Sequence, residues 1–197
     1  ANEGFTLQFP KRETPTEVLP PPHYPKLLAT FEQYSDWIET LGVSSVGALN
    51  DAIQQGRTRE LILVSEALHD HRIGEMAAQI HDRGEAARLV LIAGPSASGK
   101  TTFSKRLSIQ LLALGISPLP IGLDNFFVDR EKTPRDEQGD YDYERLEALD
   151  LYRLNHDLGQ LIAGQRVQLP HYDFVAGRQM EGEVVQISKA HIIILEG

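Results

Sequence analysis

The stretch "RLVLIAGPSASGKTTFSK", residues 88–105, constrains the fold of this chain more than any other. It opens with a continuous apolar run, passes through a loop rich in glycine and serine, and leads into an amphipathic segment over 101–114. The loop "GPSASGKT" fits the pattern G-x-x-x-x-G-K-[ST]. A buried strand, a glycine-rich turn and a helix in this order predict the phosphate-binding unit of a parallel α/β sheet.

The residue types in this loop suit an anion. Gly94 and Gly99 permit backbone angles that a Cβ would forbid, so the loop can wrap a phosphate and direct its N–H groups at it. The helix that follows adds its positive N-terminal end. Lys100 provides a point charge for β- and γ-phosphates, and the Thr101 hydroxyl is placed to bind Mg²⁺. A chance glycine-rich turn is the alternative, and the flanking strand and helix argue against it.

The whole chain divides into three parts by pattern. Residues 1–25 hold six of the eleven prolines, which predicts an extended arm. Residues 26–85 are read as a small helical domain, with an interruption near 69–71 left open. Residues 86–197 alternate strand and helix patterns, which predicts an α/β domain with a P-loop NTPase-type parallel sheet.

Within 86–197 the apolar runs predict buried strands over 88–93, 117–124 and 191–195. Helices are expected over 101–114 and 144–163, and short strands over 166–174 and 182–188. The last apolar run, "HIIILEG", stops where its next loop would begin. We therefore expect a sheet truncated after its third buried strand, in a domain incomplete at its C-terminus, and a fragment with little or no transfer activity of its own.

Composition excludes several classes of function. The chain has no cysteine, which rules out disulfides and thiolate metal sites in it. A net charge of -9 argues against broad nucleic-acid binding. No apolar run approaches a membrane span, so we expect a cytoplasmic protein without a membrane partner. The histidines show no metal-ligand spacing and are interpreted as surface or packing residues: His69, His71, His156, His171 and His191.

Two acids follow the predicted strands. Asp124 closes the second strand and Glu196 closes the third, at the edge of a parallel sheet where ligands bind. A kinase needs a group that takes a proton from an acceptor hydroxyl, so Asp124 is the candidate general base and a water-mediated Mg²⁺ partner. Glu196 is the candidate acid on the metal side. A helix cap or a solvated loop acid is the alternative for each.

Several segments together resemble the uridine kinase/phosphoribulokinase family of P-loop kinases. They are the P-loop "GPSASGKTT", "LDNFFVDRE" (123–131), "GDYDYERLEALD" (139–150), "LPHYDFVAGR" (169–178) and "IIILEG". The resemblance covers about 88–197. The segment "GRTRELILVSEALHDHRIGEMAAQI" is similar to the region that precedes the kinase domain in bacterial long-form uridine kinase-like proteins.

The resemblance implies an ATP-dependent kinase whose small-molecule acceptor is a nucleoside phosphorylated at its 5′-hydroxyl. It implies catalytic roles for Lys100 and Asp124, and Mg²⁺ near Thr101, Asp124 and Glu196. It places Glu144 at the ribose hydroxyls and Tyr172 in the base pocket, with a packed strand aromatic as the alternative for Tyr172. Tyr141 and Tyr143 are interpreted as packing residues. The positions implied for the ATP phosphates are Gly94, Pro95, Ser96, Ala97, Ser98, Gly99, Lys100, Thr101 and Thr102.

One departure from the family keeps other functions open. Uridine kinases carry a histidine shortly after the Tyr-Asp-Phe run, where this chain has Ala176 and Gly177. Arg178 beside them is a candidate acceptor contact. A kinase for another acceptor, such as a sugar phosphate, is one alternative. A non-catalytic nucleotide-sensing or RNA-associated module is the other. The charged loop 128–140 is either a solvated segment or a substrate gate, with Arg130 and Arg135 to test.

Overall fold

The computed structural model describes residues 8–18, 24–95 and 97–197. The chain consists of two compact units, Ala1–Ser65 and Glu66–Gly197. The helix α3 (Thr58–Asp82) contributes residues to both units. The described part of the proline-rich arm, 8–18, consists of turns and unpaired chain. Ser96 of the P-loop and the prolines at 20–22 lie outside the described residues. The predicted domain division at 85/86 stays a prediction.

The first unit is helical, as its sequence pattern predicts. It contains α1 (Pro25–Thr40), α2 (Val46–Gln54) and the first residues of α3. Ser45 caps α2, because its side-chain oxygen accepts a 3.1 Å hydrogen bond from the Ala48 N–H. None of the helices formed by described residues is long and apolar enough to cross a membrane.

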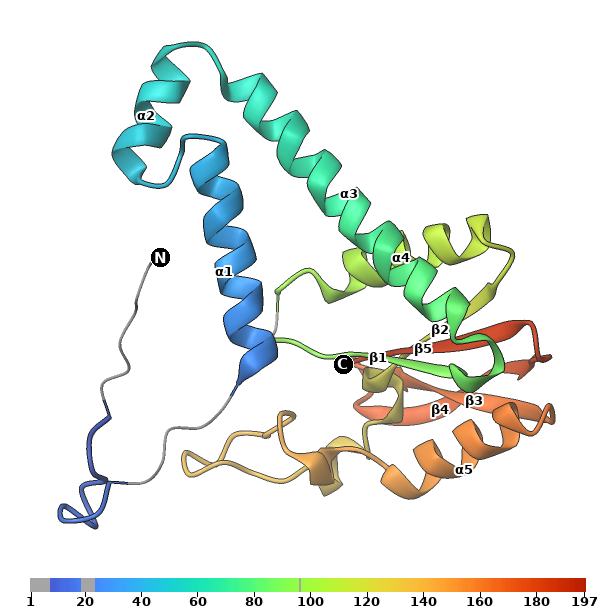
Figure 1. Cartoon of the computed structure of the whole chain (residues 1–197). Coiled ribbons are helices and arrows are strands. Elements are labelled where there is room, and N and C mark those ends of the chain that lie inside the picture. The colour runs from blue at the N-terminus through green and yellow to red at the C-terminus, as the bar shows by residue number, and fades with distance from the viewer. Residues whose placement is uncertain (1–7, 19–23, 96) are drawn as a thin grey trace. The chain divides into compact units, whose positions relative to one another are not determined.

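A parallel sheet forms the centre of the second unit (Figure 1). Its strands β1 (Leu89–Ile92), β5 (His191–Glu196) and β2 (Ser117–Gly122) lie in the order β1-β5-β2, and both pairings are parallel. Glu196 is in register with Ile92 on one side and Gly122 on the other. The predicted parallel sheet is confirmed, and its strands end together at one edge.

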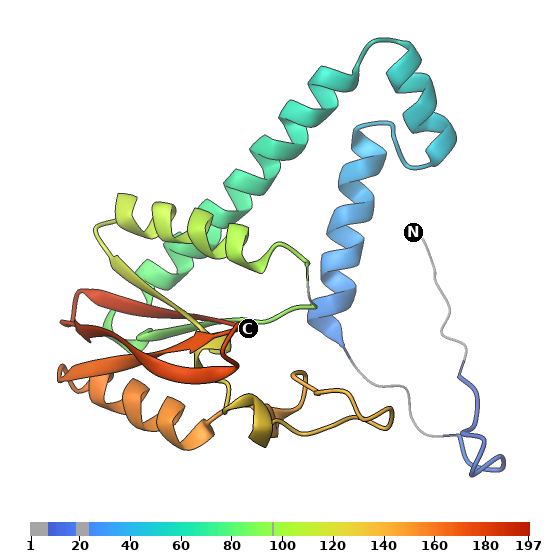
Figure 2. The same cartoon turned by 180° about the vertical axis from the view of Figure 1, so that it is seen from behind.

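Alternate residues of β5 face two separate apolar clusters. Ile192 and Ile194 pack with the second half of α3 and with α4 (Lys100–Ala113). Ile193 and Leu195 pack with α5 (Leu151–Ile162) and the hairpin described below. Figures 1 and 2 show α4 and α5 on opposite sides of the sheet. A strand covered on both faces must be apolar at every position, which explains the run "IIIL".

An antiparallel hairpin lies beside α5. It consists of β3 (Arg166–Asp173) and β4 (Arg178–Gln186), with a register shift between Gln168 and Pro170. The second strand therefore begins earlier than the predicted 182.

One expectation for the helices was wrong, and one open point is now decided. The helix expected from 144 begins at Leu151, because the Asp150 carboxylate accepts a 3.0 Å hydrogen bond from the Arg153 N–H and caps it there. The preceding residues form a short 3-10 turn, Leu146–Ala148. The interruption considered near 69–71 does not occur, since α3 is continuous through it.

Candidate functional site

A cleft of about 450 Å³ opens at the edge where the parallel strands end. This volume is within the range of small-molecule sites, about 300–1,000 Å³. The predicted site residues that line it are Gly94, Lys100, Thr101, Asp124, Glu144 and Glu196. The fold therefore brings residues from four distant segments of the sequence to one opening.

The predicted left-handed backbone of the P-loop occurs at Gly99 and not at Gly94, where a Cβ would instead lie 3.1 Å from Ser98 Oγ. Gly99 is left-handed at φ +87° and sits at the N-cap of α4, and Ala97 also has a positive φ of +57°. Positive φ is costly for alanine, and such strain is typical of ligand-binding loops. Lys100 Nζ donates to the carbonyl oxygens of Gly94 (2.9 Å) and Pro95 (3.1 Å). The ammonium group is therefore held against the loop backbone, at the cleft that would hold an anion.

The last residue of the loop motif, Thr101, contacts a carboxylate from the end of β5. Thr101 Oγ1 donates a 2.6 Å hydrogen bond to Glu196 Oε1. Asp124 lines the same cleft from a 3-10 turn, Leu123–Phe126. The prediction that Asp124 closes the second strand was wrong, since β2 ends at Gly122.

These oxygens fit Mg²⁺ and do not enclose it. Among the described residues, no group of three or more His, Cys, Asp or Glu side chains could hold a metal ion. Mg²⁺ commonly takes one or two carboxylates together with waters and substrate phosphates. Thr101, Glu196 and Asp124 are oxygen donors of that kind. They would hold Mg²⁺ together with a bound nucleotide, and the Mg²⁺ assignment itself stays a prediction.

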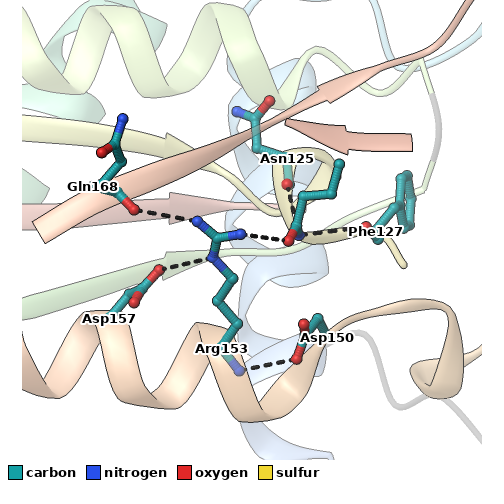
Figure 3. A network of polar contacts seen from close by, with 7 residues as sticks. Asn125, Phe127, Asp150, Arg153, Asp157 and Gln168 are labelled. Atoms are coloured by element: carbon teal, nitrogen blue, oxygen red, sulfur yellow. Dashed lines mark hydrogen bonds and ion pairs between the residues drawn. The ribbon is translucent and has the colours of Figure 1, made fainter. Parts of the chain in front are cut away.

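A polar network contacts the turn that carries Asp124 (Figure 3). Gln179 Nε2 lies 3.4 Å from the Asn125 carbonyl oxygen and 3.5 Å from that of Phe127. Arg153 Nη1 donates to Gln179 Oε1 at 2.7 Å, and Arg153 Nε lies 3.5 Å from the Asp157 carboxylate. Burial raises the pKa of Asp157, and Arg153 opposes that rise. Sequence reasoning missed this network, because its members are scattered polar residues without a motif.

Comparison with known proteins adds to this geometry. Residues 89–197, which contain the P-loop, Asp124 and Glu196, match the model of the Phosphoribulokinase / Uridine kinase family. The chain belongs to this family. The resemblance stated from the motifs is therefore confirmed, and the helices before residue 89 lie outside the matched segment.

Similar proteins in this family include two uridine kinases. The uridine kinase of Halobacterium salinarum is 30% identical over 106 residues, which covers 54% of this chain and 45% of that protein. The uridine kinase of Proteus mirabilis is 30% identical over 122 residues, covering 59% of this chain and 55% of that protein. This chain thus spans about half the length of the curated relatives it matches.

A solved structure described as that of a possible uridine kinase from Bacillus stearothermophilus is similar in fold. It has a TM-score of 0.52 and 34% sequence identity, and the match covers 64% of this chain and 70% of that chain. The likeness supports the α/β fold of the family for this chain.

Tyr172, expected in the base pocket of a family member, is buried rather than lining the cleft. It is 1% exposed, and its ring lies 5.7 Å from that of Phe127 and 5.1 Å from that of Phe174. Burial, followed by the neighbouring Tyr143 hydroxyl, raises the pKa of Tyr172 to about 12. Phe127 and Tyr143 line the cleft, with ring centroids 5.0 Å apart. Phe127 was not singled out from the sequence, and Tyr143, in the acidic-aromatic motif at 139–150, was interpreted as a packing residue although it lines the cleft.

The turn between β3 and β4 contains the departure from the family pattern. The Asp173 carboxylate accepts hydrogen bonds from the Val175 N–H (2.8 Å) and the Ala176 N–H (3.0 Å). Arg130 of the charged loop contacts this turn, because its backbone N–H donates to the Gly177 carbonyl oxygen at 2.7 Å. Arg178 starts β4 and does not line the main cleft, so its role in acceptor binding stays a prediction.

Proposed function

We propose that this chain transfers the γ-phosphoryl group of ATP to a hydroxyl group of a small molecule, and that residues 86–197 carry the activity. The first candidate for the acceptor is a nucleoside, phosphorylated at its 5′-hydroxyl. One observation carries the proposal: a single cleft is lined by the P-loop residues Lys100 and Thr101 and by the acid Asp124. A phosphate donor and a proton acceptor can therefore face the same reacting atoms.

Each residue has a distinct role in the proposed reaction. The loop amides and Lys100 neutralise charge on the β- and γ-phosphates. Asp124 takes the proton of the acceptor hydroxyl. The hydroxyl oxygen of the acceptor bonds to the γ-phosphorus, and the bond from that phosphorus to ADP breaks. Thr101 and Glu196 would hold Mg²⁺. When bound, Mg²⁺ supplies further charge neutralisation at the phosphates.

The acceptor side of the cleft supports a nucleoside. Glu144 lines the cleft and offers carboxylate oxygens to hydroxyl groups, as a ribose requires. Phe127 and Tyr143 offer ring surface in the same cleft, which suits a flat base. The uridine kinases similar to this chain are consistent with that class of acceptor.

An anionic acceptor such as a sugar phosphate is the second candidate. The observation that favours it is Arg130, whose guanidinium donates to the Phe174 carbonyl oxygen beside the turn where uridine kinases carry a histidine. A guanidinium pairs with a phosphate through two parallel hydrogen bonds, whereas it has no such partner on a neutral nucleoside.

A transfer screen tests the proposal. The chain is incubated with radiolabelled ATP, Mg²⁺ and one acceptor at a time: uridine, cytidine, a purine nucleoside or a sugar phosphate. We expect slow but detectable transfer to at least one acceptor, and loss of ATP binding and of transfer in Lys100→Ala. Lys105→Ala is the matched control, because Lys105 is an exposed lysine of the same helix and does not line the cleft.

The screen also separates the competing functions. Transfer to a sugar phosphate alone would favour the second acceptor class. ATP binding without transfer to any acceptor would contradict a kinase and favour a nucleotide-sensing module. ATP binding itself is followed by thermal unfolding, since a ligand that binds only the folded state raises the melting temperature.

A further inference from the structure

A second hollow of about 490 Å³ lies on the other flank of the P-loop. Its walls come from the loop, from the ends of β1 and the start of α4, and from α3. The residues that matter here are Ile92, Ser98, Lys100, Thr102, Phe103 and His69. His69 belongs to a helix outside the segment matched by the family model.

Lys100 lines both hollows. Thr101 faces the first hollow and its neighbour Thr102 faces the second. ATP is an elongated molecule with its reacting γ-phosphoryl group at one end. That end belongs in the first hollow, beside Asp124 and Glu196. The other end, the nucleoside, must then leave the loop on the Thr102 side, where the second hollow begins.

The chemistry of the second hollow suits a flat heteroaromatic ring. Ile92 and Phe103 contribute apolar side chains to the lining, and His69 contributes a polar ring. Arg106 Nη1 lies 3.2 Å from His69 Nδ1. A guanidinium can only donate, so Nδ1 accepts in this contact and the ring keeps its N–H at Nε2. His69 therefore combines a stacking face with one hydrogen-bond donor.

The position of His69 is fixed by an ion-pair cluster between two helices. Arg106 of α4 also donates to Asp70 Oδ1 at 3.1 Å and to Glu66 Oε2 at 3.2 Å. Glu66, His69 and Asp70 are spaced i, i+3 and i+4, so they share one face of α3. The cluster ties this face to the helix that starts at the P-loop.

We propose that α3 supplies one wall of the subsite for the nucleoside of the phosphate donor, and that His69 contacts its base or sugar. This inference rests on the proposed function, since it takes ATP as the molecule held by the loop. It assigns a ligand contact to a helix outside the family segment and to a histidine that its sequence pattern placed among surface and packing residues.

Equilibrium binding with two ligands tests the inference. The 197-residue chain is titrated with ATP and, separately, with inorganic tripolyphosphate, both with Mg²⁺. Tripolyphosphate reaches the loop and lacks a nucleoside. We expect His69→Ala to weaken ATP binding roughly threefold to tenfold, the range of one aromatic contact, and to leave tripolyphosphate binding unchanged. His69→Phe retains a stacking ring and should keep ATP affinity within about twofold of the unaltered chain.

His71→Ala is the matched control. His71 is on the same helix, its side chain is 71% exposed, and it pairs with Glu75 rather than lining the hollow. Equal ATP affinity in His69→Ala and His71→Ala would overturn the inference. So would an equal loss of ATP and tripolyphosphate binding in His69→Ala, because the histidine would then act on the phosphates or on the loop.

The same titrations separate this inference from the proposed function. If Lys100→Ala loses both ligands while His69→Ala matches the unaltered chain for both, the nucleoside wall is refuted and the phosphate site stands. If the unaltered chain binds neither ligand, both the inference and the proposed function are overturned.

Discussion

Thr101 Oγ1, at the start of α4, donates a 2.6 Å hydrogen bond to Glu196 Oε1, at the end of β5, across 95 positions of sequence. The contact exists because β5 pairs directly with β1, the strand that leads into the P-loop. The register Ile92↔Glu196 places the carboxylate level with the end of β1. The hydroxyl and the carboxylate thus lie together at the proposed Mg²⁺ position.

Thr101→Ala removes the hydroxyl from this pair. We expect the Mg²⁺ concentration for half-maximal transfer to rise by at least roughly tenfold, because a metal ligand is lost. Thr101→Ser keeps the hydroxyl and should behave like the unaltered chain. The measurement is a Mg²⁺ titration at saturating ATP, and equal requirements in the Ala and Ser variants would contradict a role for Thr101 in metal binding.

Asp124→Asn keeps the shape of the side chain and removes its capacity to take a proton. Transfer at saturating substrate should fall by about two to four orders of magnitude, the usual contribution of a general base, while ATP binding is retained. Asp140→Asn serves as the control, since Asp140 is an exposed acid that does not line the cleft. Transfer by Asp124→Asn at nearly the unaltered rate would remove the base assignment.

Arg153→Ala leaves the buried Asp157 carboxylate without its guanidinium. The Asp157 side chain is 9% exposed, and burial already raises its pKa. We expect the free energy of unfolding to fall by about 1–3 kcal/mol in urea. Adding Asp157→Asn should recover part of that loss, because no charge is then left buried. Purely additive losses in the double variant would show that the two side chains are not coupled.

Asp173 gives the chain a pH-dependent contribution to stability. The Ala176 N–H, followed by the Val175 N–H, lowers the pKa of Asp173 below its ordinary 3.8. A lowered pKa in the folded state stabilises above the unfolded value, and this stabilisation is lost as pH falls through the folded pKa. Asp173→Asn should therefore be less stable than the unaltered chain at about pH 6. The difference between their free energies of unfolding should be smaller at about pH 3. Urea unfolding at both pH values measures this difference, and a difference of constant size would contradict the assignment.

Local patterns in the sequence were sufficient for the phosphate-binding unit. The helix expected over 101–114 is α4, Lys100–Ala113, and the strand expected over 88–93 is β1, Leu89–Ile92. Residues close together in the chain decide both elements, since glycine positions set the turn and apolar spacing sets the strand and helix. The start of α5 was predicted too early, because the apolar pattern alone was followed. The N-cap at Asp150 is also a local signal, and it decides where the helix begins.

The sequence by itself determined which segments become strands and helices here and which loop can hold an anion, because these depend on neighbouring residues. Only the tertiary structure decided that β5 lies between β1 and β2, that Tyr172 is buried while Tyr143 lines the cleft, and that His69 of α3 stands beside the P-loop. Strand order and helix packing join residues far apart in the chain, and one pattern of apolar residues is compatible with several such arrangements.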